Sequence, residues 1–168
     1  MGKETSVPKQ FTDFDNNEII RPDEVPPIWR PGAYTVVLND RDEMLFLIMP
    51  GNPYLHLPGG GIDLGEQVQD AVVREAHEET GYSIELIDRH PFYMKQNNFY
   101  SRWTDEYFCG LSLFFRGRLL HDRQDLSALN QTQFRETEQV VWIPRTSIDP
   151  KNVFHFFREV IQAVLKEV

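Results

Sequence analysis

The chain has 168 residues, which is the size of one ordinary globular domain with a short surplus. Its 40% hydrophobic and 26% charged residues exclude a disordered chain. Twenty-six acidic against 17 basic residues give a formal net charge of −9. This balance argues against a non-specific nucleic-acid binder, because such a protein needs a basic face for phosphates. An anionic ligand would therefore need a local cation, either arginine or a metal ion.

Targeting features are weak along the whole chain. No run approaches the roughly 18 to 20 apolar residues of a membrane-spanning helix, and the first ten residues are polar. The single cysteine, Cys109, cannot form an internal disulfide or a cysteine-based zinc site. We therefore expect a cytoplasmic protein with no membrane partner.

Residues 1–31 differ from the rest of the chain. Five prolines interrupt regular structure there, and residues 12–20 are mostly polar. We expect an extended arm that lies across the domain and is anchored by the apolar pair Ile28 and Trp29. A disordered tail is the alternative for residues 1–10. The folded domain itself is expected over residues 32–168.

Beyond the arm, the pattern predicts strands, one helix, further strands and a closing helix. Residues 33–40 are β-branched, residues 43–49 form a short apolar run, and residues 54–58 alternate before three glycines. Residues 65–80 have helical spacing and end at Gly81, which is typical of a left-handed C-cap. Later strands are predicted over residues 82–90, 91–101, 106–120 and 140–144, and a helix over 152–168. This order indicates a single α/β (α+β) domain with a mixed sheet between helices.

Three glutamates crowd one face of the first predicted helix. Glu75, Glu78 and Glu79 are spaced i, i+3 and i+4, so they fall within an arc of about 100°. The apolar residues of the same helix cover nearly the same side. Carboxylates crowded beside an apolar stripe are costly unless a cation compensates them, and hard cations such as Mg²⁺ prefer oxygen ligands. A solvated acidic helix balanced by Arg74 is the alternative.

The spacing from Gly60 to Tyr82 distinguishes between these alternatives, because it resembles the Nudix box, the signature of the Nudix hydrolase family. The seven fixed letters of that signature are all present: Gly60, Glu66, Arg74, Glu75, Glu78, Glu79 and Gly81. Ala76 and Tyr82 depart from the usual bulky aliphatic residues at two other positions. The resemblance implies the Nudix fold, a mixed β-sheet sandwiched between helices, over roughly residues 33–168. The arm lies outside it.

The resemblance also implies a role for each box residue. Glu75, Glu78 and Glu79 are expected to ligate Mg²⁺, or Mn²⁺ in its place, with the carbonyl of Gly60 as a further ligand. Arg74 and Glu66 are expected to hold the ligating face in register. The metal would neutralise phosphate oxygens and activate water.

The general base is open between two groups of acids. Inside the box, Glu75 or Glu79 could serve. Outside it, Glu136 and Glu138 precede a late strand and are the first candidates, followed by Asp105 and Glu106.

Substrate-binding candidates come from an aromatic cluster near residue 100. Phe99, Tyr100 and Trp103 could stack a base, and Arg102 between them could hold a phosphate. Packing at a sheet edge is the alternative for all four. The histidines His56 and His77 are expected to have polar edge roles.

These observations predict a Mg²⁺-dependent Nudix hydrolase that cleaves a phosphoanhydride in a nucleoside diphosphate linked to another moiety. Dinucleoside polyphosphates and nucleotide sugars are among the substrates considered. A nucleoside triphosphate pyrophosphatase is the alternative, followed by a non-catalytic nucleotide-binding regulator. The expected partner is a nucleotide-type small molecule; nucleic acid is disfavoured by the net charge, and either a monomer or a homodimer is compatible with the sequence.

Overall fold

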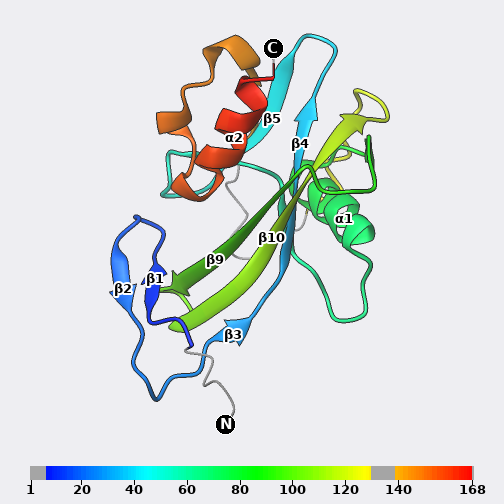
Figure 1. The fold of residues 1–168 in the computed structure, drawn as a ribbon. Coiled ribbons are helices and arrows are strands. Elements are labelled where there is room, and N and C mark those ends of the chain that lie inside the picture. The colour runs from blue at the N-terminus through cyan, green and yellow to red at the C-terminus, as the bar shows by residue number, and fades with distance from the viewer. Residues whose placement is uncertain (1–6, 130–138, 168) are drawn as a thin grey trace.

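The computed structural model describes residues 7–129 and 139–167. Its helices are α1 (Val68–Thr80) and α2 (Arg158–Leu165), with short 3-10 turns at Arg145–Ser147, Pro150–Asn152 and His155–Phe157. The strands are β1 (Gln10–Thr12), β2 (Glu18–Ile20), β3 (Ile28–Trp29), β4 (Gly32–Leu38), β5 (Glu43–Ile48), β6 (Leu55–His56), β7 (Gly59–Gly61), β8 (Ile84–Leu86), β9 (Tyr93–Ser101), β10 (Glu106–Leu119) and β11 (Gln139–Pro144). Figure 1 shows their arrangement.

The long strand β10 organises the sheet. It pairs antiparallel with β9 and β8, and parallel with β4 and β3. The main path of the sheet runs β11-β5-β4-β10-β9-β1-β2, and it contains both parallel and antiparallel pairs. The predicted mixed sheet in a single domain is therefore confirmed.

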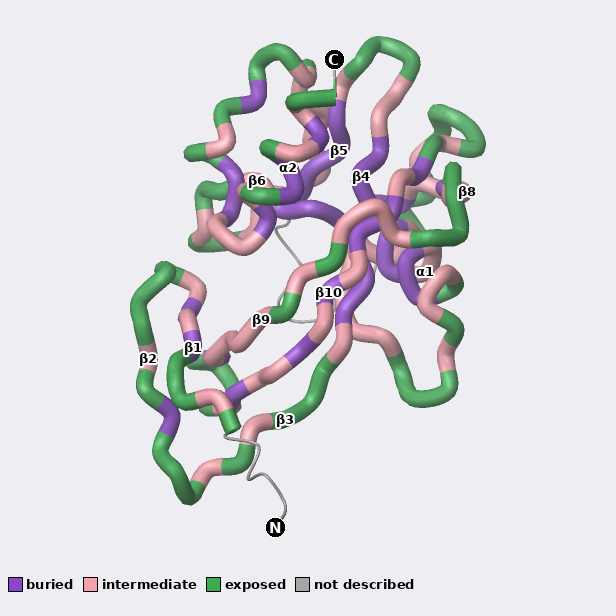
Figure 2. The backbone as a smooth tube through the Cα atoms, viewed as in Figure 1, coloured by how far each residue is buried: buried purple, intermediate pink, exposed green. Residues whose placement is uncertain are grey.

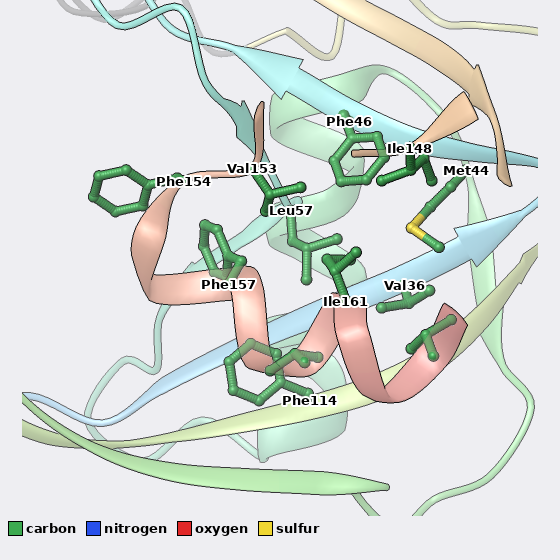
Figure 3. Packing of buried hydrophobic residues seen from close by; sticks show 12 residues of the cluster. Val36, Met44, Phe46, Leu57, Phe114, Ile148, Val153, Phe154, Phe157 and Ile161 are labelled. Atoms are coloured by element: carbon green, nitrogen blue, oxygen red, sulfur yellow. The ribbon is translucent and has the colours of Figure 1, made fainter. Parts of the chain in front are cut away.

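The two helices cover opposite faces of this sheet, as Figure 1 shows. Side chains alternate between the faces along each strand, so neighbouring residues enter different cores. Phe114 packs in the cluster beneath α2, whereas Phe115 packs in the cluster beneath α1. Figure 3 shows the α2 cluster, in which Phe157 and Ile161 meet Phe46 of β5. The buried stretches in Figure 2 follow β4, β5 and the facing turns of both helices.

Both helices are shorter than the sequence predicts. α1 begins at Val68 rather than at residue 65, after a turn in which Gly65 has a φ of 85°, and it ends as expected at Gly81 with a φ of 70°. The closing helix begins at Arg158, because two 3-10 turns precede it, Pro150–Asn152 and His155–Phe157. The first of these turns starts at a proline. Neither helix in the described ranges is long and apolar enough to cross a membrane.

Described residues of the arm extend the sheet. β1 pairs with β9, β2 pairs with β1, and β3 pairs with β10. The expected anchor pair is wrong: Ile28 is 42% exposed and Trp29 is 65% exposed. They are held by backbone pairing with β10, so their side chains need not be buried. Among the described residues of this segment, the buried ones are Phe11, Asp13 and Arg21, at 1%, 1% and 4% exposed.

Candidate catalytic site and substrate cavity

The glycine strand β7 brings backbone directly against the acidic face of α1. A Cβ on Gly60 would lie 2.7 Å from Glu75 Oε2, and a Cβ on Gly59, whose φ is 137°, would clash with the backbone of β4. Glycine at position 60 therefore lets the buried Glu75 carboxylate contact the main chain, and glycine at position 59 lets β7 pair closely with β4. The backbone N–H of Gly59 also donates to Glu79 Oε2 at 2.8 Å.

Arg74 lies at the centre of the carboxylates. Its Nε and Nη2 donate to the two oxygens of Glu66 at 2.8 and 2.9 Å. Its Nη1 donates to Glu75 Oε1 at 2.9 Å and to Glu78 Oε2 at 3.4 Å. The bond from Arg74 lowers the pKa of Glu66 to about 2, and the same bond raises the pKa of Arg74. One arginine fork thus holds three carboxylates in register.

The donor set suits a hard divalent cation, although the side chains are not gathered into a finished site. Within residues 7–129 and 139–167, no three His, Cys, Asp or Glu side chains converge as a metal site. The glutamates of α1 offer carboxylate oxygens next to the backbone of Gly60, and oxygen ligands are those that Mg²⁺ and Mn²⁺ prefer. Because Arg74 already pairs with Glu75 and Glu78, an ion bound here competes with its guanidinium.

A cavity of about 300 Å³ opens beside this acidic face. Its lining includes the three glycines of β7 and Glu79 of α1, together with Phe99 and Trp103 of the aromatic cluster. A single cavity therefore connects the box to the aromatic cluster. Its volume matches the lower end of the range for small-molecule sites.

The four predicted substrate residues separate into two pairs. Phe99 and Trp103 line the cavity, whereas Tyr100 and Arg102 do not. The hydroxyl of Tyr100 donates to Asp105 at 2.8 Å. The guanidinium of Arg102 is committed to Asp13 and Asp15 of the arm. The two carboxylates balance the charge of Arg102, and its phosphate contact stays a prediction.

The candidates for the general base lie in three places. Glu79 lines the cavity, and Glu75 lies beside Gly60. Asp105 and Glu106 lie at the turn between β9 and β10 and do not line the cavity. The remaining candidates, Glu136 and Glu138, lie outside the described residues.

Arg30 and Phe14 also line the cavity, although no motif pointed to either of them. His56 lines it as well, as a buried ring that is 5% exposed rather than in the polar edge role expected of it. Arg30 extends beside β7, where a Cβ on Gly61 would lie 3.1 Å from its Nε. In the described parts of the chain, no carboxylate forms an ion pair with this guanidinium. An arginine without a carboxylate partner, next to a glycine strand, can bind an anion such as phosphate. Arg30 lies at the end of the proline-rich arm, and the sequence pattern there does not predict a phosphate contact.

Comparison with known families identifies the class of protein to which this fold and site belong. The family model described as the NUDIX domain matches residues 28–164. The chain therefore belongs to the NUDIX domain family, the Nudix hydrolases. The match starts at β3, so it does not include β1 and β2.

Individual relatives carry more specific names. The putative 8-oxo-dGTP diphosphatase of Bacillus subtilis (strain 168) is 41% identical over 59 residues, which are 35% of this chain and 40% of that protein. The RNA pyrophosphohydrolase of Erythrobacter litoralis (strain HTCC2594) is 33% identical over 120 residues, covering 66% of this chain and 71% of that protein. The crystal structure of the MutT protein from Bacillus halodurans has a TM-score of 0.56 at 17% identity, over 81% of this chain and 82% of that chain. That structural likeness shows the shared fold.

Proposed function

We propose that this protein hydrolyses a phosphoanhydride bond in a nucleoside diphosphate linked to another moiety, with Mg²⁺ as the preferred ion. The observation that carries this proposal is the cavity, whose lining combines a carboxylate and glycine backbone with aromatic rings. A nucleotide presents the matching combination, a phosphate chain joined to a planar base. The charge of −9 is compatible with such a substrate, because a cation can bridge acidic protein and acidic phosphate.

Each box residue has a role in this proposal. A bound divalent cation supplies positive charge against the phosphate oxygens and lowers the pKa of water. Glu75, Glu78 and Glu79 hold that cation, together with the backbone of Gly60. Arg74 keeps the carboxylates in register through its bonds to Glu66 and Glu75.

Proton uptake and phosphate binding complete the proposed site. Glu79 is our first choice to accept the proton of the attacking water, because it lines the cavity. Glu136 and Glu138 remain the candidates from outside the box. Arg30 binds a substrate phosphate, which fits its position beside Gly61.

A nucleoside triphosphate pyrophosphatase is the second candidate. The name of the B. subtilis relative favours it, and a triphosphate fits the same combination of phosphate chain and base. The name of the E. litoralis relative adds RNA as a substrate to test, although the net charge disfavours it. We further propose a cytoplasmic location and either a monomer or a homodimer, which sedimentation would distinguish.

A substrate panel tests the proposal. The purified protein is incubated with nucleoside triphosphates, ADP-ribose, nucleotide sugars, dinucleoside polyphosphates, coenzyme A and 5′-triphosphorylated RNA, with Mg²⁺, with Mn²⁺ or with chelator, and products are identified by mass. We expect metal-dependent cleavage concentrated in the diphosphate-linked class. Preferential cleavage of triphosphates would select the second candidate. A folded protein that cleaves no member of the panel would contradict both.

A further inference from the structure

One residue that lines the cavity, Phe14, comes from a segment that lies before the family match. We call residues 10–20, which contain β1 and β2, the N-terminal hairpin. Its first strand pairs in parallel with β9, where Thr12 is opposite Phe99. The next turn carries Phe14 into the cavity. The centroid of the Phe14 ring lies 4.7 Å from that of Trp103 and 5.7 Å from that of Phe99, both at steep interplanar angles.

The same ring joins a second group of planar side chains. Phe14 lies 4.9 Å from Phe154 and 6.0 Å from His56, between ring centroids. His56 stacks on Phe154 at 4.5 Å, is 5% exposed, and within the described residues its Nε2 has no hydrogen-bond partner. Burial lowers the pKa of His56 to about 4, so its ring is neutral at pH 7. This part of the cavity therefore presents flat, uncharged rings, which favour a planar aromatic ligand.

An internal ion pair fixes the hairpin in this position. The carboxylate of Asp13, which is 1% exposed, accepts from the backbone N–H of Asn17 at 2.8 Å and from Arg102 Nε at 3.0 Å. Arg102 follows β9, so the bond ties the turn of the hairpin to the sheet. His155 contacts the backbone oxygen of Asp13 at 3.1 Å from the other side. Because Phe14 is the next residue, these contacts determine where its ring lies.

We propose that Phe14 is a specificity-determining residue that stacks on the nucleobase of the substrate. Asp13 and Arg102 are positioning residues that hold Phe14 against the cavity. The inference rests on the proposed function, since it treats the aromatic part of the cavity as the base subsite. It also departs from the family pattern, because the N-terminal hairpin lies before the matched residues 28–164.

Equilibrium binding tests this role without requiring catalysis. The probes are the four ribonucleoside 5′-monophosphates, with ribose 5-phosphate as the counterpart that lacks a base, titrated by NMR. We expect Phe14→Ala to raise the Kd of the preferred monophosphate about tenfold, the order of one lost base–aromatic stack, and to leave ribose 5-phosphate unchanged. Phe14→Leu keeps apolar bulk for folding and should show the same loss, whereas Phe14→Trp should retain binding.

The control and the second set of variants separate stacking from general stability. Ile20→Ala changes an exposed side chain, 60% exposed, on the same hairpin and should bind every probe as the wild type does. Arg102→Gln should weaken monophosphate binding, and Arg102→Lys should restore part of it. Wild-type affinity in both Phe14→Ala and Phe14→Leu would overturn the proposal, as would a wild-type protein that binds no monophosphate. Base-dependent binding that needs Phe14, in a protein that cleaves nothing in the panel, would support the subsite and contradict only the hydrolase proposal.

Discussion

The box segment and the N-terminal hairpin contribute to the same cavity in different ways. From Gly59 to Gly81, the chemistry lies within a single strand, turn and helix, so spacing along the chain translates directly into positions in space. The N-terminal hairpin reaches the cavity through contacts with distant segments, among them the pairing with β9 and the bond between Asp13 and Arg102, which are 89 residues apart. Spacing along the chain can therefore define the metal-binding part of a site, whereas the proposed base-binding part depends on contacts between distant segments.

The largest effect is expected in the box segment, from the substitution Glu79→Gln. Loss of a proton acceptor and of a negative metal ligand should lower kcat about 10²- to 10⁴-fold while the fold remains intact. Steady-state kinetics on the best substrate of the panel, with circular dichroism for folding, measures this. The matched control is Glu85→Gln, which changes an acid of β8 that pairs with Arg118 of β10. This variant should keep wild-type turnover. Full activity in Glu79→Gln would contradict its place in the site.

The anchoring of the arm is tested by comparing two aromatic residues. Phe11 is 1% exposed, so Phe11→Ala should lower the free energy of unfolding by about 3 to 5 kcal/mol. Trp29 is 65% exposed, so Trp29→Ala should change it by less than about 0.5 kcal/mol. Urea denaturation measures both. Equal losses would show that the side chain of Trp29 is buried in solution.

The buried imidazole of His56, which lines the cavity, should make the stability of the protein depend on pH. The pKa of His56 is lowered from 6.5 to about 4 by burial, so the unfolded chain takes up a proton before the folded protein does. Stability should therefore be unaffected by His56 above pH 6.5 and fall as the pH drops from 6.5 to 4, by about 3 kcal/mol at 1.36 kcal/mol per pKa unit.

The same pH series on variants isolates this contribution. His56→Phe should lose less stability than the wild type over the window from pH 6.5 to 4. His90→Gln, which changes an exposed side chain, should follow the wild type. Parallel curves for the wild type and His56→Phe would place the imidazole in contact with water.

The smallest effect is expected at Arg30. If its guanidinium binds a substrate phosphate, Arg30→Gln should raise KM about tenfold with a smaller change in kcat, because one hydrogen bond to a charged group is lost. Arg118→Gln, which removes an exposed arginine, is the control. An unchanged KM in Arg30→Gln would contradict a contact between this guanidinium and the substrate phosphate.

Much of the architecture was predictable because local patterns specify it. The strands at 33–40 and 43–49 appear as β4 and β5, and Gly81 ends α1 in the left-handed conformation. The boundaries of the closing helix were wrong, since apolar spacing does not separate 3-10 turns from an α-helix. The exposure of Ile28 and Trp29 was also missed, because backbone pairing can hold a strand without burying its side chains.

The sequence by itself determined the family of this protein and the placement of its acids on one helix face. Those properties depend on spacing within about twenty residues, where helix geometry leaves little freedom. Only the tertiary structure decided that Arg102 pairs with Asp13 rather than facing the cavity, and that Arg30, Phe14 and His56 line it. Such contacts join residues far apart in the chain, and no local period records them. They follow from strand pairing and from the requirement that a buried charge such as Asp13 find its partner.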